Sequence, residues 1–418
     1  MKSIESFGGI RRAVDLMPPL EPPKPGRSLP GSYYLREDLF EVELAVIHGS
    51  HWLFVGHSIE VPNPGDYLTY EIGRDCLFVI RQDDGELRAF HNVCRHRGSR
   101  LVGDERGNAK RIVCPYHAWT YGGDGRLLAA RQMPASFEKS SYGLFEAAVA
   151  EFSGLIFICL AERPRPIAQM ASDAQSRLLP YHLEATQIAD RADYVVEANW
   201  KIIAENFREC YHCGPSHPEY SRIIAGATAA DSRKLAEEAE AATRAQRATW
   251  VACGLDHPDI NFTPERDWLL QRFAFRGSAT TQSLDGQPVA PLLGVLKDRR
   301  AGVLAFTVRP NLWLEATSDH VVTMRHTPLS PTRTHVRMTW LVNKNAKPGR
   351  DFSREEVSAF WRITGEEDWR ICAATQAGVA SSHYQPGPLA PSETPTAEWL
   401  AWYLKTIGLW PAEERAVV

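Results

Sequence analysis

The chain has 418 residues, of which 44% are hydrophobic and 23% are charged, and its formal net charge is −4. Its length predicts two or three domains, and the lack of a basic excess argues against nucleic acid as a partner. No stretch approaches the roughly 20 apolar residues that span a bilayer, and no apolar signal segment precedes the early prolines. We therefore expect a cytoplasmic protein that binds neither nucleic acid nor a membrane.

Three segments of different character follow one another along the chain. Residues 1–44 combine a proline-rich arm with a short helical pattern, which we expect to pack on the C-terminal domain. Residues 45–165 consist of short apolar or alternating runs between turn signals, as is typical of a small all-β domain. Residues 166–418 mix helical and strand patterns and predict an α+β domain. Neither a GxGxxG turn nor a Walker loop occurs, so we expect no nucleotide site on this chain.

Two pairs of Cys and His residues lie in the β segment. Cys94 and His96 form a CxH pair, and after 17 further residues Cys114 and His117 form a CxxH pair. Zinc sites usually pair Cys with Cys and His with His. One residue of each type in each loop instead suits a two-iron cluster held by two thiolates and two imidazoles. The remaining interpretation, four unrelated buried side chains, is disfavoured because the pairs recur together.

A second group of polar residues lies in the stretch NWKIIAENFRECYHCGPSHPEY. Its apolar residues have helical spacing, and Glu209 and His212 would share one face of that helix. Gly214 and Pro215 should end the helix near Cys213, so that His217 folds back toward His212. Taken alone, the two histidines also fit satisfied core or turn residues. A metal site here needs a third ligand.

The third ligand is expected on a helix that begins after Ser353. Asp368 lies on the apolar stripe of this helix, where a carboxylate is costly unless it is paired or binds a metal. Glu366 falls outside the stripe, and Glu367 is a rival that the pattern does not exclude. Two histidines and one carboxylate leave open positions on Fe(II), an arrangement that binds and activates O₂.

With these motifs the chain resembles the oxygenase component of Rieske non-haem iron oxygenases over almost its whole length. The resemblance implies an α+β protein with an all-β Rieske [2Fe-2S] domain and a helix-grip (START-like) catalytic domain built on an antiparallel sheet. It implies that Cys94 and Cys114 hold one cluster iron and His96 and His117 the other. A mononuclear Fe(II) would be bound by the residues His212, His217 and Asp368.

Within that family the chain resembles the branch that demethylates glycine betaine and proline betaine. Glu209 stands where most members have Asp, and the run ECYHC around it is typical of this branch. The run TGEED, which ends at Asp368, departs from the usual TNEQD, which weakens the transfer of detail around the iron. The resemblance implies that Glu209 joins His117 of a neighbouring subunit to His212, in a homotrimer, and that Glu209 and Asn206 take part in catalysis. It also implies a small-molecule substrate, O₂, and a separate NAD(P)H-dependent reductase of the flavin or ferredoxin type.

Three functions are therefore compared. The first is N-demethylation of a small quaternary ammonium compound, and the second is hydroxylation of an aromatic or carboxylic substrate by the same metals. The third is a Rieske-type electron carrier or a zinc-stabilised binding protein, which leaves His212, His217 and Asp368 unexplained. A quaternary ammonium group would need aromatic faces, and seven aromatic residues of the second domain are candidates: Tyr194, Phe207, Tyr211, Trp268, Phe273, Phe306 and Trp313. Cys210 and Cys213, beside His212, are interpreted as packing residues or as free thiols close to the metal site rather than as ligands.

Overall fold

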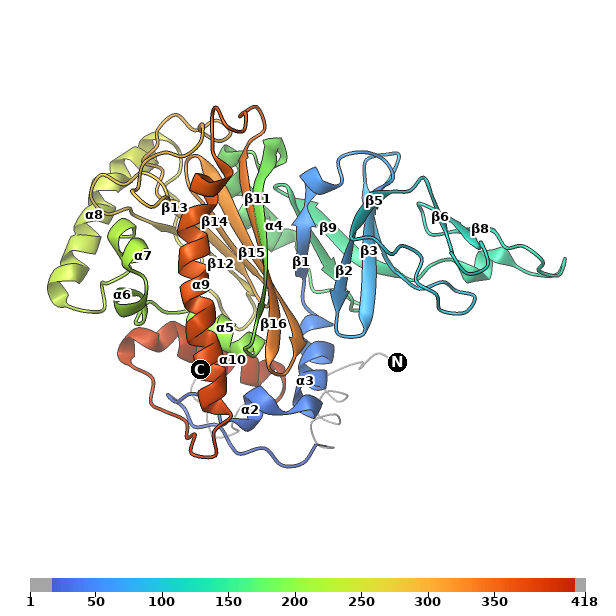
Figure 1. The fold of residues 1–418 in the computed structure, drawn as a ribbon, viewed down its shortest axis with the longest axis horizontal. Coiled ribbons are helices and arrows are strands. Elements are labelled where there is room, and N and C mark those ends of the chain that lie inside the picture. Colours follow the sequence, from blue (N-terminus) through green and yellow to red (C-terminus); the bar gives the residue numbers. More distant parts are fainter. Residues whose placement is uncertain (1–16, 410–418) are drawn as a thin grey trace. The chain divides into compact units, whose positions relative to one another are not determined.

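A computed structural model describes residues 17–409 of the chain. These residues divide into two units, one running from His48 to Gln175 and the other comprising the chain up to Ile47 and from Ser176 onward. Figure 1 shows the course of the chain through both. The helices are α2 (Ser32–Leu35), α3 (Glu37–Glu43), α4 (Ala168–Leu178), α5 (Trp200–Asn206), α6 (Cys213–Ser216), α7 (Pro218–Ile223), α8 (Arg233–Ala252), α9 (Arg354–Val379) and α10 (Thr394–Thr406).

The unit from His48 to Gln175 is built on strands, as its turn-rich sequence predicts. A seven-stranded sheet has the order β1-β10-β9-β4-β3-β2-β5, and a three-stranded sheet has the order β6-β7-β8. The strands are β1 (Leu53–His57), β2 (Asp66–Ile72), β3 (Asp75–Arg81), β4 (Leu87–His91), β5 (Arg106–Asn108), β6 (Arg111–Val113), β7 (Thr120–Gly122), β8 (Leu127–Ala129), β9 (Glu146–Phe152) and β10 (Leu155–Cys159). The small sheet presents the loop between β6 and β7, where one of the Cys and His pairs lies.

The second unit contains a six-stranded antiparallel sheet of order β11-β16-β15-β14-β13-β12. Its inner strands β13 and β15 are buried along most of their length, although β15 also carries polar side chains such as Thr323 and His326. The prediction of an α+β protein with an antiparallel catalytic sheet is confirmed. The strands are β11 (Thr186–Val196), β12 (Trp268–Phe273), β13 (Val303–Val308), β14 (Leu312–Ala316), β15 (His320–Ser330) and β16 (Arg333–Asn343).

The long helix α9 packs against β11 and against α5, and Figure 1 shows it running along the sheet. It begins as the sequence predicts, because the Ser353 side chain accepts a hydrogen bond from the backbone N–H of Glu356. Its buried face includes Phe360, Trp361 and Asp368. This helix, which also packs against α7, therefore carries one predicted metal ligand, Asp368, into the interior.

A buried ion pair fixes α5 to the N-terminal and C-terminal helices of the same unit. The Nζ of Lys201 lies 2.6 Å from Oε1 of Glu43 on α3, and both side chains are at most 1% exposed. Trp200 and Tyr403 donate further hydrogen bonds to the same carboxylate. Because every polar atom of this cluster has a partner, it holds α5 in one position relative to α3 and α10.

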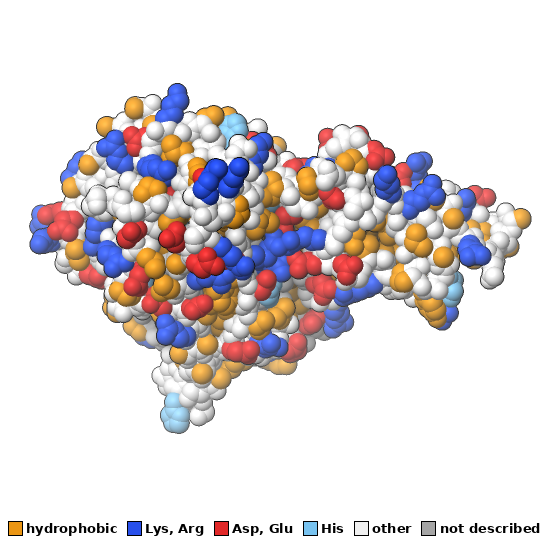
Figure 2. All heavy atoms as spheres, turned by 45° about the horizontal axis from the view of Figure 1, so that its top comes forward, with side chains coloured by type: hydrophobic (Ala, Val, Ile, Leu, Met, Phe, Trp, Pro, Cys, Tyr) orange, Lys and Arg blue, Asp and Glu red, His pale blue; other side chains and the backbone are white. Residues whose placement is uncertain are grey.

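The exposed face in Figure 2 carries Lys, Arg, Asp and Glu side chains in alternation, without one sign dominating. Most of α8 is exposed, which agrees with its alternating charged sequence, and its ion pairs such as Arg233 with Glu237 are solvated. Among residues 17–409, none of the helices combines the length and the apolar composition that a bilayer crossing needs.

Candidate active site

Two loops of the β unit carry the paired Cys and His residues. Cys94 and His96 follow β4, whereas Cys114 and His117 lie between β6 and β7. The backbone N–H of each cysteine is hydrogen-bonded across its own loop, at 2.8 Å in both cases. Both turns use left-handed backbone, with φ of +77° at Gly98 just after His96 and +55° at the residue after His117. The two loops are therefore tight and similarly built.

The two thiols are buried and the two imidazoles are exposed. Cys94 and Cys114 are each 2% exposed, whereas His96 and His117 lie on the surface with their ring centres 4.7 Å apart. Tyr121 lies beneath them, with its Oη 3.4 Å from Sγ of Cys94. Two buried thiols and two paired, exposed imidazoles are the ligand types that would hold a two-iron cluster, with two thiolates on one iron and two imidazoles on the other. The four predicted residues thus lie in one place and fit the cluster.

Aromatic rings orient both exposed imidazoles. His96 is stacked on Trp119 with ring centres 4.8 Å apart and planes 7° from parallel. His117 is stacked on the exposed ring of Tyr116 at 3.9 Å. These contacts fix the ring orientations while leaving the outer ring edges in solvent.

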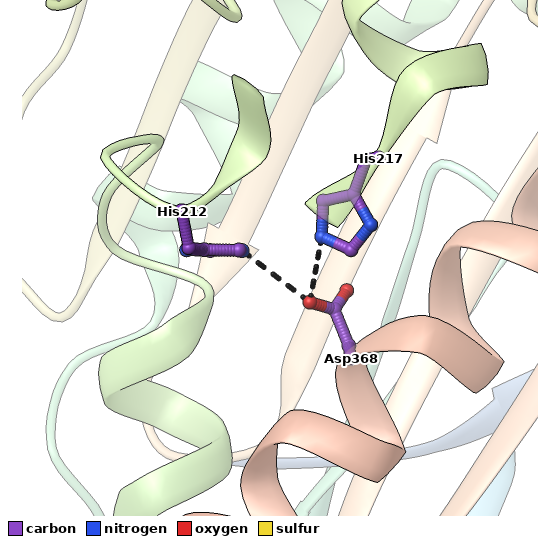
Figure 3. Close-up of side chains that lie close together, drawn as sticks. All are labelled: His212, His217 and Asp368. Atoms are coloured by element: carbon purple, nitrogen blue, oxygen red, sulfur yellow. Dashed lines mark hydrogen bonds and ion pairs between the residues drawn. The ribbon is translucent and has the colours of Figure 1, made fainter. Parts of the chain in front are cut away.

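In the second unit, His212, His217 and Asp368 come together, as Figure 3 shows. Oδ1 of Asp368 lies 3.0 Å from Nε2 of His217 and 3.4 Å from Nε2 of His212. The three candidate ligand atoms lie within 4.8 Å of one another. Both imidazoles thus direct Nε2 at the same carboxylate oxygen. Two imidazole nitrogens and one carboxylate oxygen are the ligand set that would bind Fe(II) and leave further coordination positions free.

The pKa values of the three groups reflect their mutual contact. Burial disfavours the charged form of His212, but hydrogen bonds to Asp368 and Glu209 outweigh it and raise its pKa to about 9. Burial also opposes the charge of Asp368, yet the hydrogen bonds from both histidines hold its pKa below the ordinary value. The site without a metal thus concentrates negative charge next to two imidazoles, which is the electrostatic setting for a bound cation.

A second carboxylate contacts each histidine at Nδ1, the ring nitrogen that does not face Asp368. Oε1 of Glu209 lies 2.6 Å from Nδ1 of His212, and Oε2 of Glu367 lies 2.9 Å from Nδ1 of His217. Such contacts fix the tautomer and ring orientation of a metal-bound imidazole. Of the two candidates for the third ligand, Asp368 therefore contacts the Nε2 atoms of both histidines, whereas Glu367 contacts only the Nδ1 atom of His217.

The predicted helix through Glu209 and His212 is wrong in its extent. Helix α5 ends at Asn206, and a turn follows before α6 begins at Cys213. The Glu209 side chain accepts hydrogen bonds from the backbone N–H groups of Tyr211 and His212. These side-chain hydrogen bonds take the place of helical backbone hydrogen bonds and close the turn. Glu209 and His212 therefore meet across a turn and not on one face of a helix. Asn206 remains at the helix end, with Nδ2 3.3 Å from Nε2 of His212.

A second correction concerns the two cysteines on either side of His212. Cys210 and Cys213 were expected to be packing residues or free thiols close to the metal site, but the structure joins them in a disulfide. Their separation of three residues across the turn after α5 brings the two Cα atoms to 4.8 Å, within reach of a disulfide. The covalent link closes the loop that carries His212.

A cavity that is partly open to solvent adjoins the three candidate ligands. Its aromatic lining consists of Phe207, Tyr220, Trp313 and Trp361. Of the seven aromatic candidates, the lining includes Phe207 and Trp313. Trp361 and Tyr220 were missed as lining residues, although both had a signal: Trp361 lies two helical turns before Asp368, and Tyr220 lies three residues after His217. Twelve residues line the cavity in all: Asn206, Phe207, Glu209, Cys210, His212, Cys213, His217, Tyr220, Trp313, Trp361, Thr364 and Asp368.

Comparisons with known proteins agree with this architecture. Residues 51–151 match the Rieske [2Fe-2S] domain, and residues 183–408 match the family described as ring hydroxylating alpha subunit (catalytic domain). The two sites and these matches define a Rieske non-haem iron oxygenase, with a [2Fe-2S] cluster in one unit and a mononuclear iron in the other. The chain belongs to the ring-hydroxylating alpha-subunit family.

Particular relatives narrow the comparison. The chain is 35% identical over 392 residues to the glycine betaine monooxygenase oxygenase subunit of Chromohalobacter salexigens, covering 91% of this chain and 86% of that protein. It is 36% identical over 202 residues to the carnitine monooxygenase oxygenase subunit of Acinetobacter pittii, covering 47% and 54%. A solved quaternary ammonium Rieske monooxygenase shares the fold, with a TM-score of 0.71 at 24% identity over 92% of this chain and 96% of that one.

Proposed function

We propose that this oxygenase removes an N-methyl group from a small quaternary ammonium compound such as glycine betaine or proline betaine. The observation that carries the proposal is the cavity beside His212, His217 and Asp368, whose walls include Phe207 and three further aromatic rings. A quaternary ammonium group neither donates nor accepts a conventional hydrogen bond, so aromatic faces are the surfaces that recognise it. The similarity to a glycine betaine monooxygenase subunit over 91% of the chain supports the same substrate class.

The proposed reaction hydroxylates one N-methyl carbon. One oxygen atom of O₂ is inserted into a C–H bond, and the other leaves as water after the uptake of two electrons and two protons. The N-hydroxymethyl product then loses its hydroxyl proton, its C–N bond breaks, and formaldehyde and a tertiary amine are released. The mononuclear iron, when bound, supplies the activation of O₂. The chain itself binds the methyl group beside the metal ligands and surrounds it with apolar rings that limit the access of water.

We assign the metal ligands as the geometry suggests. The buried Cys94 and Cys114 would hold one iron of the cluster, and the paired His96 and His117 the other. For the mononuclear iron the assigned ligands are His212, His217 and Asp368, whose candidate atoms face a common point. Glu209 orients His212 from its Nδ1 side, and Asn206 can hydrogen-bond in the cavity at the end of α5.

Electron supply is part of the same proposal. We infer a homotrimer in which His117 of one subunit faces Glu209 of the next, and a separate reductase of the flavin or ferredoxin type that draws electrons from NAD(P)H. Two features support this: the outer edge of His117 is exposed, and Glu209 already bonds the Nδ1 of His212. We expect these reactions to take place in the cytoplasm.

A single-turnover experiment tests the proposed function. The anaerobically reconstituted enzyme is reduced chemically, mixed with O₂ and one of glycine betaine, proline betaine, carnitine, choline or an aromatic acid, and the formaldehyde per mononuclear iron is measured. Near-stoichiometric formaldehyde from one of the ammonium compounds is expected. Consumption of the aromatic acid without formaldehyde from any of the others would contradict the proposal and favour ring hydroxylation.

A further inference from the structure

The two indoles in the cavity wall are both tied to one buried carboxylate. Nε1 of Trp313 donates to Oε1 of Glu315 at 3.2 Å. Nε1 of Trp361 donates to Oε1 of Gln282 at 3.1 Å, and Nε2 of Gln282 donates to Oε2 of Glu315 at 2.5 Å. The carboxylate thus contacts one indole directly and reaches the other through one amide, although it does not itself line the cavity.

Glu315 is buried without a cationic hydrogen-bond partner. It is 1% exposed on β14, and the two groups that donate to it, the Gln282 amide and the Trp313 indole, are both neutral. Desolvation raises the pKa of Glu315 to about 7, against the two hydrogen bonds that favour its ionised form. A buried carboxylate of this kind is unfavourable unless a positive charge approaches it. The aromatic side of the wall is where a cationic substrate would approach.

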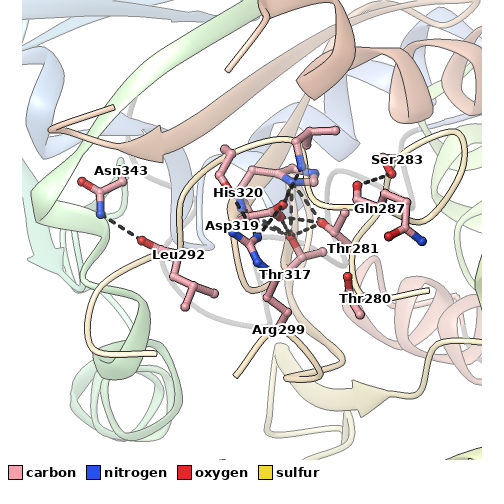
Figure 4. Close-up of polar contacts among 12 residues, drawn as sticks. Thr280, Thr281, Ser283, Gln287, Leu292, Arg299, Thr317, Asp319, His320 and Asn343 are labelled. Atoms are coloured by element: carbon pink, nitrogen blue, oxygen red, sulfur yellow. Dashed lines mark hydrogen bonds and ion pairs between the residues drawn. The ribbon is translucent and has the colours of Figure 1, made fainter. Parts of the chain in front are cut away.

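Figure 4 shows how the loop that carries Gln282 is held in place. The hydroxyl of Thr281 donates to Asp319 at 2.5 Å, and Asp319 also contacts His320 and accepts from the backbone of the same loop. On the other side of Gln282, the Ser283 hydroxyl donates to the carbonyl of Gln287 at 2.7 Å. Because both neighbours of Gln282 are anchored, its amide is held between Trp361 and Glu315 rather than free to turn.

Other charged and titratable groups face this wall. The guanidinium of Arg208 lies 5.7 Å from the centre of the Trp313 ring and would oppose a second cation there. Burial, the Glu315 carboxylate and Asp368 together hold the pKa of Tyr220 well above its usual value, so that phenol stays neutral. Trp361 packs edge-on against Tyr220 at 5.7 Å. At this corner of the cavity, the negative charges of Glu315 and Asp368 are opposed by the positive charge of Arg208.

We propose that Glu315 is a specificity-determining residue that makes the cavity select a positively charged head group over an uncharged one of the same shape. An indole that donates its N–H to a carboxylate is polarised toward a more negative ring face, and the carboxylate adds its own attraction through a medium of low dielectric constant. The inference rests on the proposed function and refines it. Glu315 acts through Trp313 and Trp361 and is therefore a positioning residue.

The test compares two ligands that differ only in charge. The dissociation constants of glycine betaine and of its uncharged-head isostere 3,3-dimethylbutyrate are measured on the anaerobic holoenzyme, in the native chain and in Glu315→Gln. We expect the native enzyme to prefer glycine betaine and the variant to lose about tenfold of that preference, through weaker binding of glycine betaine alone. A merely structural carboxylate would weaken both ligands together, and that result would overturn the inference.

Glu205→Gln provides the matched control. Glu205 is also a desolvated carboxylate with its pKa raised to about 7, but it accepts its hydrogen bond from Tyr34 rather than from a residue of the cavity wall. Its amide variant should keep the native preference. If Glu205→Gln lost as much of the preference for glycine betaine as Glu315→Gln, removing any buried carboxylate would be enough to lower that preference. This result would overturn the specific role of Glu315.

The remaining outcomes separate the inference from the proposed function. If the native enzyme binds both ligands equally, the quaternary ammonium substrate is wrong and the role of Glu315 fails with it. If Glu315→Gln keeps the full preference, only the role of Glu315 fails. Should that variant lose its iron or unfold, Gln282→Met disconnects Trp361 while retaining the carboxylate. A smaller loss of preference is then expected, and an unchanged preference would overturn the inference.

Discussion

Replacing Glu367 with Gln separates the roles of the two carboxylates that follow one another on α9. Glu367 lies 2.9 Å from Nδ1 of His217, whereas Asp368 lies 3.0 Å from Nε2 of the same ring. If Asp368 is the iron ligand, the Glu367→Gln variant keeps all three ligands and loses only the negative partner of His217. Asp368→Asn instead weakens the ligand set itself.

The size of the first effect follows from the position of Glu367. Removing a carboxylate that orients a metal-bound histidine typically weakens metal affinity by about 10- to 100-fold. At about 1.4 kcal/mol per tenfold change, this corresponds to about 1.4–2.8 kcal/mol of binding free energy. The Glu367 side chain is 16% exposed, so solvent screens part of its charge and favours the lower end of the range. The loss in Asp368→Asn should exceed this range.

Competition with a ferrous chelator measures both effects. Each variant is loaded with Fe(II) anaerobically and titrated with a chromogenic chelator of known affinity, and the absorbance of the Rieske cluster serves as an internal standard. Glu366→Gln is the control, because Glu366 is exposed and its carboxylate accepts a hydrogen bond from Tyr194 rather than from a histidine. Weaker iron binding in Glu367→Gln than in Asp368→Asn would refute the assignment of Asp368 as the ligand.

Three further predictions concern stability and are checked by unfolding measurements. Lys201→Met leaves the buried Glu43 carboxylate without its cation and should cost about 3–5 kcal/mol; adding Glu43→Gln should restore much of it, and an additive double variant would contradict this. Because desolvation raises the folded-state pKa of Glu205 to about 7 from 4.5, the native chain loses stability as pH rises from 4.5 to 7. Glu205→Gln should therefore stabilise the protein by about 1–3 kcal/mol at pH 8 and hardly at pH 4, and equal effects at both values would exclude this cause. Ser353→Ala removes the N-terminal cap of α9 and should cost about 1 kcal/mol, whereas no change would show that the cap is redundant.

Local features of the sequence predicted the parts of the site that depend on local structure. The proposed cluster ligands lie within two short loops, so the spacing from Cys94 to His96 and from Cys114 to His117 was enough to predict that they lie close together. Asp368 was predicted from the apolar stripe of one long helix, and the helix was found with that residue buried. In both cases the determining contacts lie within a few residues of one another.

Features that depend on side-chain contacts or on distant segments escaped prediction. The helical spacing of apolar residues predicted that α5 continues through His212. It could not predict that the Glu209 carboxylate accepts hydrogen bonds from the backbone N–H groups of Tyr211 and His212 and thereby closes a turn. The disulfide between Cys210 and Cys213 depends on that same turn. Glu315 lies on a strand with no polar pattern, and its importance appears only when the loop carrying Gln282 is placed beside it.

Isotopic labelling of the substrate tests the central claim most directly. Glycine betaine carrying three ¹³C methyl groups is given to the reduced enzyme with O₂ in a single turnover, and the products are analysed by mass spectrometry. The account predicts one labelled formaldehyde and one dimethylglycine with two labelled methyl groups for each mononuclear iron. Recovery of the intact labelled substrate while O₂ is consumed, with no formaldehyde from this or any other ammonium compound, would contradict it.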